Sequence, residues 1–229
     1  TGAVAQVKAE DFTQGSVKDA AQLLSGKVAG LSIVTPSGDP SASSQILLRG
    51  VATINTNTQP LILIDGIPGD LNTVAPEDIE SIDVLKDGSA AAIYGTRGTN
   101  GVILINTRRP NGRIEPTISY RGYVSTQEFV RVPKMLNAAQ FRQKIAEGVA
   151  FDDQGFTTDW VKEISRKTPI SHQHNMTFRG GNSKTNYLAT LNYRQLEGVV
   201  LKSDYRTINS RVDVNHNMFD NKLKVNLNF

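Results

Sequence analysis

The sequence predicts a mixed α and β domain over residues 1–112, followed from residue 113 by antiparallel strands that cross a membrane. Three observations carry this prediction. Strand and helix signals alternate in the first half, and its most apolar strands have no polar face. Apolar and polar residues alternate one by one in the second half. The connections between those later segments alternate between short and long.

The first half contains four strand signals, two helix signals and a short helical turn after Pro76. A serine followed by apolar residues at helical spacing predicts a helix that begins after Ser16 and ends at Gly30. A second, short helix is predicted in DGSAAAIYG, capped by Ser89. The predicted strands are QILLRGV, QPLILIDGIP, SIDVLK and GVILINTRR. Because LILI and VILI are apolar throughout, their sheet should be covered on both faces.

Three glycines after the second helix raise the question of a phosphate-binding loop. Such a loop needs its glycines before a helix whose amide groups face the anion. Here the helix precedes Gly95, Gly98 and Gly101, and a strand follows them. The glycines are therefore predicted to allow a turn with positive φ and close backbone contact.

The second half predicts five strands with one apolar and one polar face. They are TISYRGYVS, HNMTFRG, NYLATLNYR, NSRVDVNHNMF and KLKVNLNF. The polar faces are rich in Asn, Arg and Thr, which suits a water-filled lumen if the other face meets lipid. A soluble β-sandwich alternates in the same way, so a soluble glycan-binding module or hydrolase remains an alternative.

The connections favour the membrane interpretation. The turns GGNSK and FDNK are short, whereas QLEGVVLKSD and residues 131–171 are longer, as in outer-membrane barrels. The longest connection predicts two helices, one after Asn137 and one capped by Thr158 or Asp159. Five strands cannot close a barrel, and an open edge is not tolerated in lipid, so we expect a larger barrel.

Composition and isolated motifs exclude several classes of function. The net charge of +3 is too small to indicate nucleic-acid binding. The absence of cysteine excludes thiol catalysis, disulfides and thiolate metal sites. His172 and His174 should share a strand face but have no helical metal-ligand spacing. The sequence therefore predicts no enzyme activity, no cofactor and no metal.

Seven carboxylates in the first half could in principle include the acid pair of a glycoside hydrolase. Their positions at turns and helix starts instead predict helix caps and surface charge. They are Asp65, Asp70, Glu77, Asp78, Glu80, Asp83 and Asp87.

Several sequence segments resemble those of the SusC/RagA-type TonB-dependent outer-membrane transporters. LSGKVAGL, LIDGIP and DIESIDVLKDGSAAAIYGTRGTNGVI resemble the plug domain, and the chain from TDWVKEISRK to VDVNHNM resembles the first barrel strands. The resemblance implies an α+β plug domain over residues 1–112, followed by antiparallel transmembrane β-strands. Residues 113–229 would form about five strands with a long first extracellular loop at 131–171. The chain would thus be the N-terminal fragment of a plugged barrel of about 22 strands.

The resemblance also implies a function and partners. A transporter of this type imports oligosaccharides or peptides across the cell outer membrane, with the plug gating the lumen. Its implied partners are a SusD-like surface lipoprotein, outer-membrane lipid, the oligosaccharide or oligopeptide ligand, and TonB. The TonB-binding segment is expected upstream of Thr1.

Two groups of site residues follow from the resemblance. Arg49 and Arg97 lie beside glycines, and the resemblance implies that they pair with acids on the inner barrel wall. Asn55, Thr56 and Asn57 lie in a polar loop that would help to form the floor of the ligand cavity. Their amides and hydroxyl could bind sugar hydroxyls or peptide groups.

Overall fold

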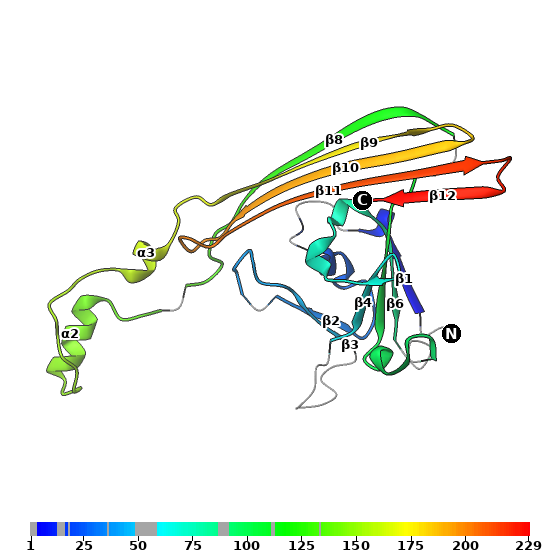
Figure 1. The fold of residues 1–229 in the computed structure, drawn as a ribbon. Helices are drawn as coiled ribbons and strands as arrows, with labels where there is room; N and C mark the ends of the chain where they lie inside the picture. The colour runs from blue at the N-terminus through cyan, green and yellow to red at the C-terminus, as the bar shows by residue number, and fades with distance from the viewer. Residues whose placement is uncertain are drawn as a thin grey trace.

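The computed structural model describes two parts that pack together. The described residues are 4–12, 17, 19–35, 37–48, 59–86, 92–110, 113–132 and 134–229. Residues 4–110, here called the N-terminal region, contain short strands and 3-10 helices. Residues 114–228 contain five strands, β8 to β12, here called the long-strand sheet. This sheet lies across one side of the N-terminal region (Figure 1).

The central sheet of the N-terminal region has the strand order β1-β6-β7-β4-β5. Its strands are β1 (Val4–Lys8), β4 (Leu61–Ile64), β5 (Ile67–Pro68), β6 (Ile79–Leu85) and β7 (Val102–Thr107). β4 and β7 are parallel, and the other neighbours are antiparallel. β2 (Leu31–Val34) and β3 (Gln45–Leu48) form a separate pair. The predicted strands at β3, β4, β6 and β7 are confirmed, whereas β1 and β2 were not predicted.

The helix predicted between Ser16 and Gly30 is wrong in its extent. The described part is the short 3-10 helix η2 (Ala20–Leu24), and its N-cap is Asp19, which accepts from the amide of Gln22. Asp19 also accepts a hydrogen bond from Ser44 Oγ at 2.6 Å, which ties the helix start to the chain just before β3. The positive φ of Gly26 turns the chain soon after Leu24, so the helix ends early.

Four further helices among the described residues are single turns, namely η1 (Ala9–Asp11), η3 (Leu71–Thr73), η4 (Pro76–Asp78) and η5 (Gly95–Gly98). The helix predicted in DGSAAAIYG is described only at residues 92–94, which are helical, and its predicted cap Ser89 lies outside the described residues. The turn predicted after Pro76 is confirmed as η4. This turn leads directly into β6, and it places two consecutive carboxylates beside the long-strand sheet.

The central sheet is packed on both faces, as predicted from LILI and VILI. One face joins β6 and β7 to η2 through a core that includes Leu24, Ile82, Val84 and Ile105. The opposite face carries a smaller cluster of Leu63, Leu85 and Val102 with Leu61, Tyr94 and Leu104 packed against it. The N-terminal region therefore has an apolar core of its own.

The glycine-rich segment forms a structural turn, as predicted. Gly95 and Gly101 have φ values of +62° and +89°. A Cβ atom on Gly101 would lie 2.9 Å from the carbonyl oxygen of Leu85 and 2.7 Å from Leu48 Cδ1. Gly101 is needed because β7 begins in close contact with the end of β6.

The long-strand sheet is antiparallel throughout and confirms the five predicted strands. They are β8 (Ile114–Thr126), β9 (Ile170–Gly181), β10 (Thr185–Glu197), β11 (Asp204–Met218) and β12 (Leu223–Asn228). The connection between β8 and β9 holds α2 (Ala138–Ala146) and α3 (Trp160–Ile164) and extends far from the rest of the molecule (Figure 1). Asn137 and Asp159 cap these helices, as predicted.

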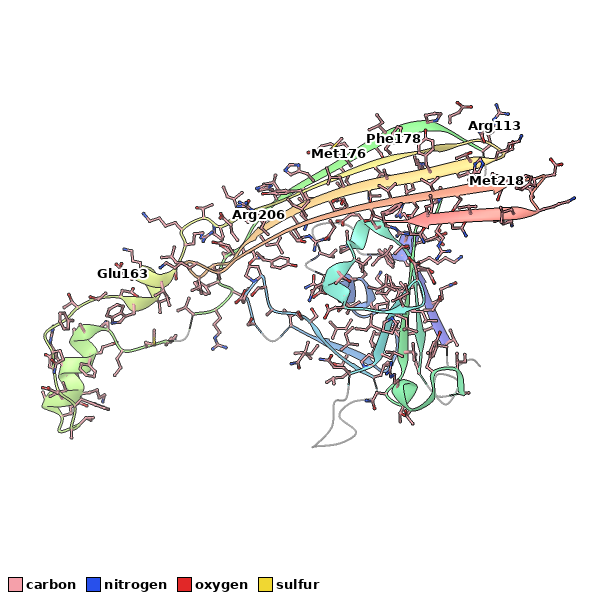
Figure 2. The ribbon with its side chains drawn as sticks, viewed as in Figure 1. Arg113, Glu163, Met176, Phe178, Arg206 and Met218 are labelled. Atoms are coloured by element: carbon pink, nitrogen blue, oxygen red, sulfur yellow. The ribbon has the colours of Figure 1, made fainter. Side chains whose placement is uncertain are left out.

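The two faces of the long-strand sheet differ in polarity. The inward face, toward the N-terminal region, buries polar side chains such as Asn175, Thr190 and Asn192. On the outward face, Met176 and Phe178 point away from that region (Figure 2), and they are 47% and 43% exposed. The predicted alternation of a polar and an apolar strand face is confirmed. No helix within the described ranges is long and apolar enough to cross a membrane.

Candidate functional site

Charged residues gather where the inward face of β10 and β11 covers the N-terminal region. We call this contact the acid–arginine interface. It consists of Asp65, Glu77, Asp78, Thr190, Asn192, Arg194, Arg211 and Asp213. The three carboxylates from the N-terminal region follow β4 or belong to η4, so short turns hold them against the strands.

Asp78 is the most deeply buried of these three carboxylates. One of its oxygens, Oδ2, accepts hydrogen bonds from Thr190 Oγ1 at 3.1 Å and Asn192 Nδ2 at 2.7 Å. The side chains of Thr190 and Asn192 point inward because they are two residues apart on one strand. Burial raises the pKa of Asp78 above its ordinary value, and the two hydrogen bonds oppose that shift only in part.

Glu77 forms a second contact with the same strand. Its Oε2 lies 3.6 Å from Arg194 Nη2, and both side chains are largely buried. This oxygen has no hydrogen-bond partner within the described structure. The contact is therefore an ion pair without a hydrogen bond, stabilised by the attraction between the two opposite charges.

Asp65 and Arg211 form the third contact. Asp65 occupies the turn after β4 with a φ of 49°, a conformation that Asp tolerates better than most residues. Its carboxylate accepts a hydrogen bond from the amide of Thr107 at 3.0 Å and lies 3.6 Å from Arg211 Nη2. Arg211 Nε lies 2.7 Å from Asp213 Oδ2 on the same strand. Arg211 thus joins a carboxylate of each part.

Comparisons with known proteins place this chain in a family. The model of the TonB-dependent receptor plug domain matches residues 1–102. SusC of Bacteroides thetaiotaomicron is 34% identical over 242 residues, covering 100% of this chain and 24% of that protein. TonB-dependent receptor P3 of Formosa agariphila is 36% identical over 235 residues, with coverages of 100% and 23%. The chain belongs to the SusC/RagA type of TonB-dependent receptors.

Solved structures agree with this assignment. The RagAB peptide importer in its closed-closed state matches 99% of this chain and 30% of that chain, with a TM-score of 0.84 and 25% identity. The siderophore receptor PirA of Acinetobacter baumannii matches 99% of this chain and 31% of that chain, with a TM-score of 0.63 and 19% identity, which shows a shared fold. The chain spans about a quarter of the length of the curated relatives named above.

The family assignment gives the N-terminal region its name, the plug. The curated relatives are receptors rather than enzymes, and receptors of this family are outer-membrane proteins. The acid–arginine interface is therefore a contact between a plug and the strands that follow it. Because its groups are charged or polar, water could hydrate each of them if the two parts were separated.

The arginines predicted for a latch are not the ones that the structure brings to this interface. Arg97 lies in η5 with its side chain exposed, and it has no ion pair among the described residues. Arg49, Asn55, Thr56 and Asn57 lie outside the described residues. The latch and the ligand-cavity floor therefore stay predictions. In the observed interface the plug supplies three carboxylates, and the strands supply Arg194 and Arg211.

The prediction that the plug carboxylates serve only as caps and surface charge is wrong for Glu77 and Asp78. Both are largely buried, because the polar face of β10 covers them. Asp70 does cap η3, as predicted. The useful signal was the period-two pattern, which assigns Arg194 and Arg211 to the polar strand face. Polar faces must meet charged or polar partners, and acids clustered at plug turns could supply them.

The histidines lie on the other side of the sheet. His172 and His174 share the outward face of β9, as predicted, with His172 Nδ1 3.2 Å from His174 Nε2. Tyr120 Oη lies 2.6 Å from His174 Nδ1. In the part of the chain that the structure describes, no group of three or more His, Asp or Glu side chains could hold a metal ion.

Proposed function

We propose that the chain forms the gate and the first wall strands of an active outer-membrane importer for oligosaccharides or peptides. In this proposal, residues 1–112 form the plug and residues 113–229 begin a barrel. Residues 131–171 form its first extracellular loop. TonB supplies the energy through a segment before Thr1, and a SusD-like lipoprotein covers the outer side.

The observation that carries the proposal is the sidedness of the long-strand sheet. Its polar face packs on the plug through the acid–arginine interface, and its apolar face is turned outward. An outward face lined with apolar side chains suits lipid, and an inward polar face suits a lumen that becomes wet when the plug moves. The name of the RagAB peptide importer supports peptides as one class of ligand.

The proposed mechanism uses the interface as a reversible contact. Ligand held above the plug would favour a plug conformation in which TonB can engage the N-terminal segment, so binding of ligand and of TonB would be energetically linked. Pulling would then separate Asp78 from Thr190 and Asn192, and Glu77 from Arg194. Each freed group would be hydrated, which limits the free energy needed for separation.

A reversible crosslink tests this proposal, because the sequence contains no native cysteine. Cysteines would replace Asp78 and Thr190 in the longest natural polypeptide that carries this chain. A short bis-methanethiosulfonate reagent would then join plug to strand. We expect uptake of the ligand to stop while its binding persists, and reductant should restore uptake. Each single-cysteine variant, treated in the same way, serves as the control.

Two outcomes would contradict the proposal. Undiminished uptake by the crosslinked protein would show that this interface does not open during import. A polypeptide that is monomeric in water without detergent and unfolds cooperatively would instead favour the soluble glycan-binding module or hydrolase.

A further inference from the structure

A cavity lies between the plug and the inward face of β8 and β9. Its volume is about 320 Å³, and its walls include the end of the plug, residues 108–110, and side chains of both strands. Four arginines line it. They are Arg108, Arg109, Arg121 and Arg179. The cavity shares the Glu77–Asp78 turn with the acid–arginine interface but extends away from β11.

Most of the positive charge in this cavity is not neutralised. Arg109 lies 3.6 Å from Asp65, whereas Arg108 donates to the carbonyl of Ile79 and Arg179 donates to Thr117 Oγ1. Within the described ranges, Arg108, Arg121 and Arg179 have no carboxylate within ion-pair distance.

The two acids of the cavity wall do not offset this charge. Glu77 is already paired with Arg194. Asp78 accepts hydrogen bonds from Thr190 and Asn192, and the four arginines outnumber the two carboxylates on the cavity wall. The cavity is therefore electropositive.

A buried donor on the cavity wall also lacks an acceptor. Asn175 is 6% exposed, and its Nδ2 has no hydrogen-bond partner in the described structure. Asn175 is paired in register with Arg121 on the inward face, so their side chains are direct neighbours across the strands. A buried amide donor without a partner is costly and needs an acceptor. An oxygen of an anion would supply one.

We propose that this cavity binds an oxyanion, a carboxylate or sulfate group carried by the oligomer that the importer takes up. The proposal rests on the import function proposed above. Guanidinium groups bind such anions with two parallel hydrogen bonds, and Arg121 beside Asn175 offers a guanidinium and an amide donor on one face. The volume is large enough for one charged unit of an oligomer. The site lies on the seam between plug and strands, where an imported oligomer would pass once the plug moves.

The first test locates the anion directly. Crystals of the longest natural polypeptide that carries this chain would be soaked in selenate, and its anomalous signal would be mapped. We expect a peak in the cavity near Arg121 and Asn175, and no peak there in the Arg121→Gln variant. Lys224→Gln is the matched control, because Lys224 lies on the inward face of β12 outside the cavity. Absence of a peak in the unmodified protein, or a peak that survives Arg121→Gln, would overturn the proposal.

The second test measures affinity in solution and identifies the source of the anion. Titration calorimetry at constant ionic strength should show selenate binding that weakens roughly tenfold in Arg121→Gln, the loss of one charge-assisted hydrogen bond. Lys224→Gln should bind as the unmodified protein does. Equal weakening in both variants would indicate a general effect of charge and would contradict a built site.

Competition then distinguishes the possible ligands. Galactose 6-sulfate, glucuronate and a Glu-Glu dipeptide would each be tested for displacement of selenate. Displacement of selenate by galactose 6-sulfate or glucuronate supports an anionic saccharide as the ligand, and displacement by the dipeptide supports an acidic peptide. Selenate binding that none of them displaces would overturn the role in uptake. If no anion binds while the plug–strand crosslink still blocks uptake, this inference is wrong and the importer proposal stands.

Discussion

The plug and the long-strand sheet bury opposite kinds of side chain. The plug encloses apolar residues on both faces of its central sheet, and several of them are fully buried. The long-strand sheet buries mainly Asn, Thr, Gln and Asp on its inward face, together with Leu188 and Leu196, and exposes most of its apolar residues on the outward face. The plug therefore has an apolar core of its own, whereas the strands expose apolar side chains on their outward face. Within the described residues, the contact between the two parts is mostly polar.

Removing apolar volume from the plug core should have the largest effect. Ile105 is fully buried in the core of the central sheet, so Ile105→Ala should lower the free energy of unfolding by about 4 kcal/mol. Urea unfolding, with hydrogen exchange to assign the loss to the plug, measures this change. Ile67→Ala in the exposed strand β5 is the control and should change stability by less than about 0.5 kcal/mol. Similar effects at both positions would contradict a self-contained core.

A charge on the outward face should have the next largest effect. Leu191 is 47% exposed at the middle of β10, and Leu191→Arg should cost about 3 kcal/mol of folding free energy in a bilayer. Val149→Arg is the matched control, because Val149 is 39% exposed in the connection between α2 and α3. Folding into lipid vesicles of the longest natural polypeptide measures both. If Leu191→Arg were as harmless as the control, the outward face would not meet lipid.

Breaking the acid–arginine interface should have an intermediate effect. Arg211→Gln leaves Asp213, which is almost fully buried, without a cation, and we expect a loss of about 2 kcal/mol. Arg206→Gln on the outward face of β11 is the control, and Figure 2 labels its exposed position. Hydrogen exchange at the plug turn around Asp65 reports whether the contact has loosened. A change confined to the strands would mean that Arg211 stabilises only its own sheet.

The smallest expected effect concerns pH. The folded-state pKa of Asp78 is raised above its ordinary value of 3.8, so the stability that this group contributes is complete below that value and declines as the pH rises through the raised pKa. Asp78→Asn keeps an oxygen for Thr190 and Asn192 and removes the charge. We expect equal stability at acidic pH and a small advantage for the variant at neutral pH. A lower stability at neutral pH would show that the charge itself holds the contact.

Much of this fold followed from local pattern. Alternation predicted all five long strands, and apolar runs predicted the paired β4 and β7. The strand β1 was missed because VAQVK is short and pairs only with β6. The helix after Ser16 was overestimated because apolar spacing continues past Gly26, where a positive φ turns the chain. The sequence pattern alone did not show that the helix would end before Gly26 although the apolar spacing continues beyond it.

The site was harder to predict because it depends on contacts between distant segments. Glu77 and Arg194 lie far apart in the sequence, and nothing near either residue indicates its partner. The pattern placed Arg194 on the polar face of its strand, but the sequence could not tell which plug residues that face would cover. The resemblance drew attention to plug arginines, whereas the described contact uses plug carboxylates.

The position of β1 has a mechanical consequence. It is an edge strand held by β6 alone, and its first residue, Val4, is paired with Leu85. It also runs crosswise to the long strands (Figure 1). A force applied to its N-terminal end along the axis of those strands would load the Val4–Leu85 pair first and then each following pair in turn. The hydrogen bonds between β1 and β6 would therefore break one after another at low force. The buried hydrogen bonds between β6 and β7 would meanwhile remain intact.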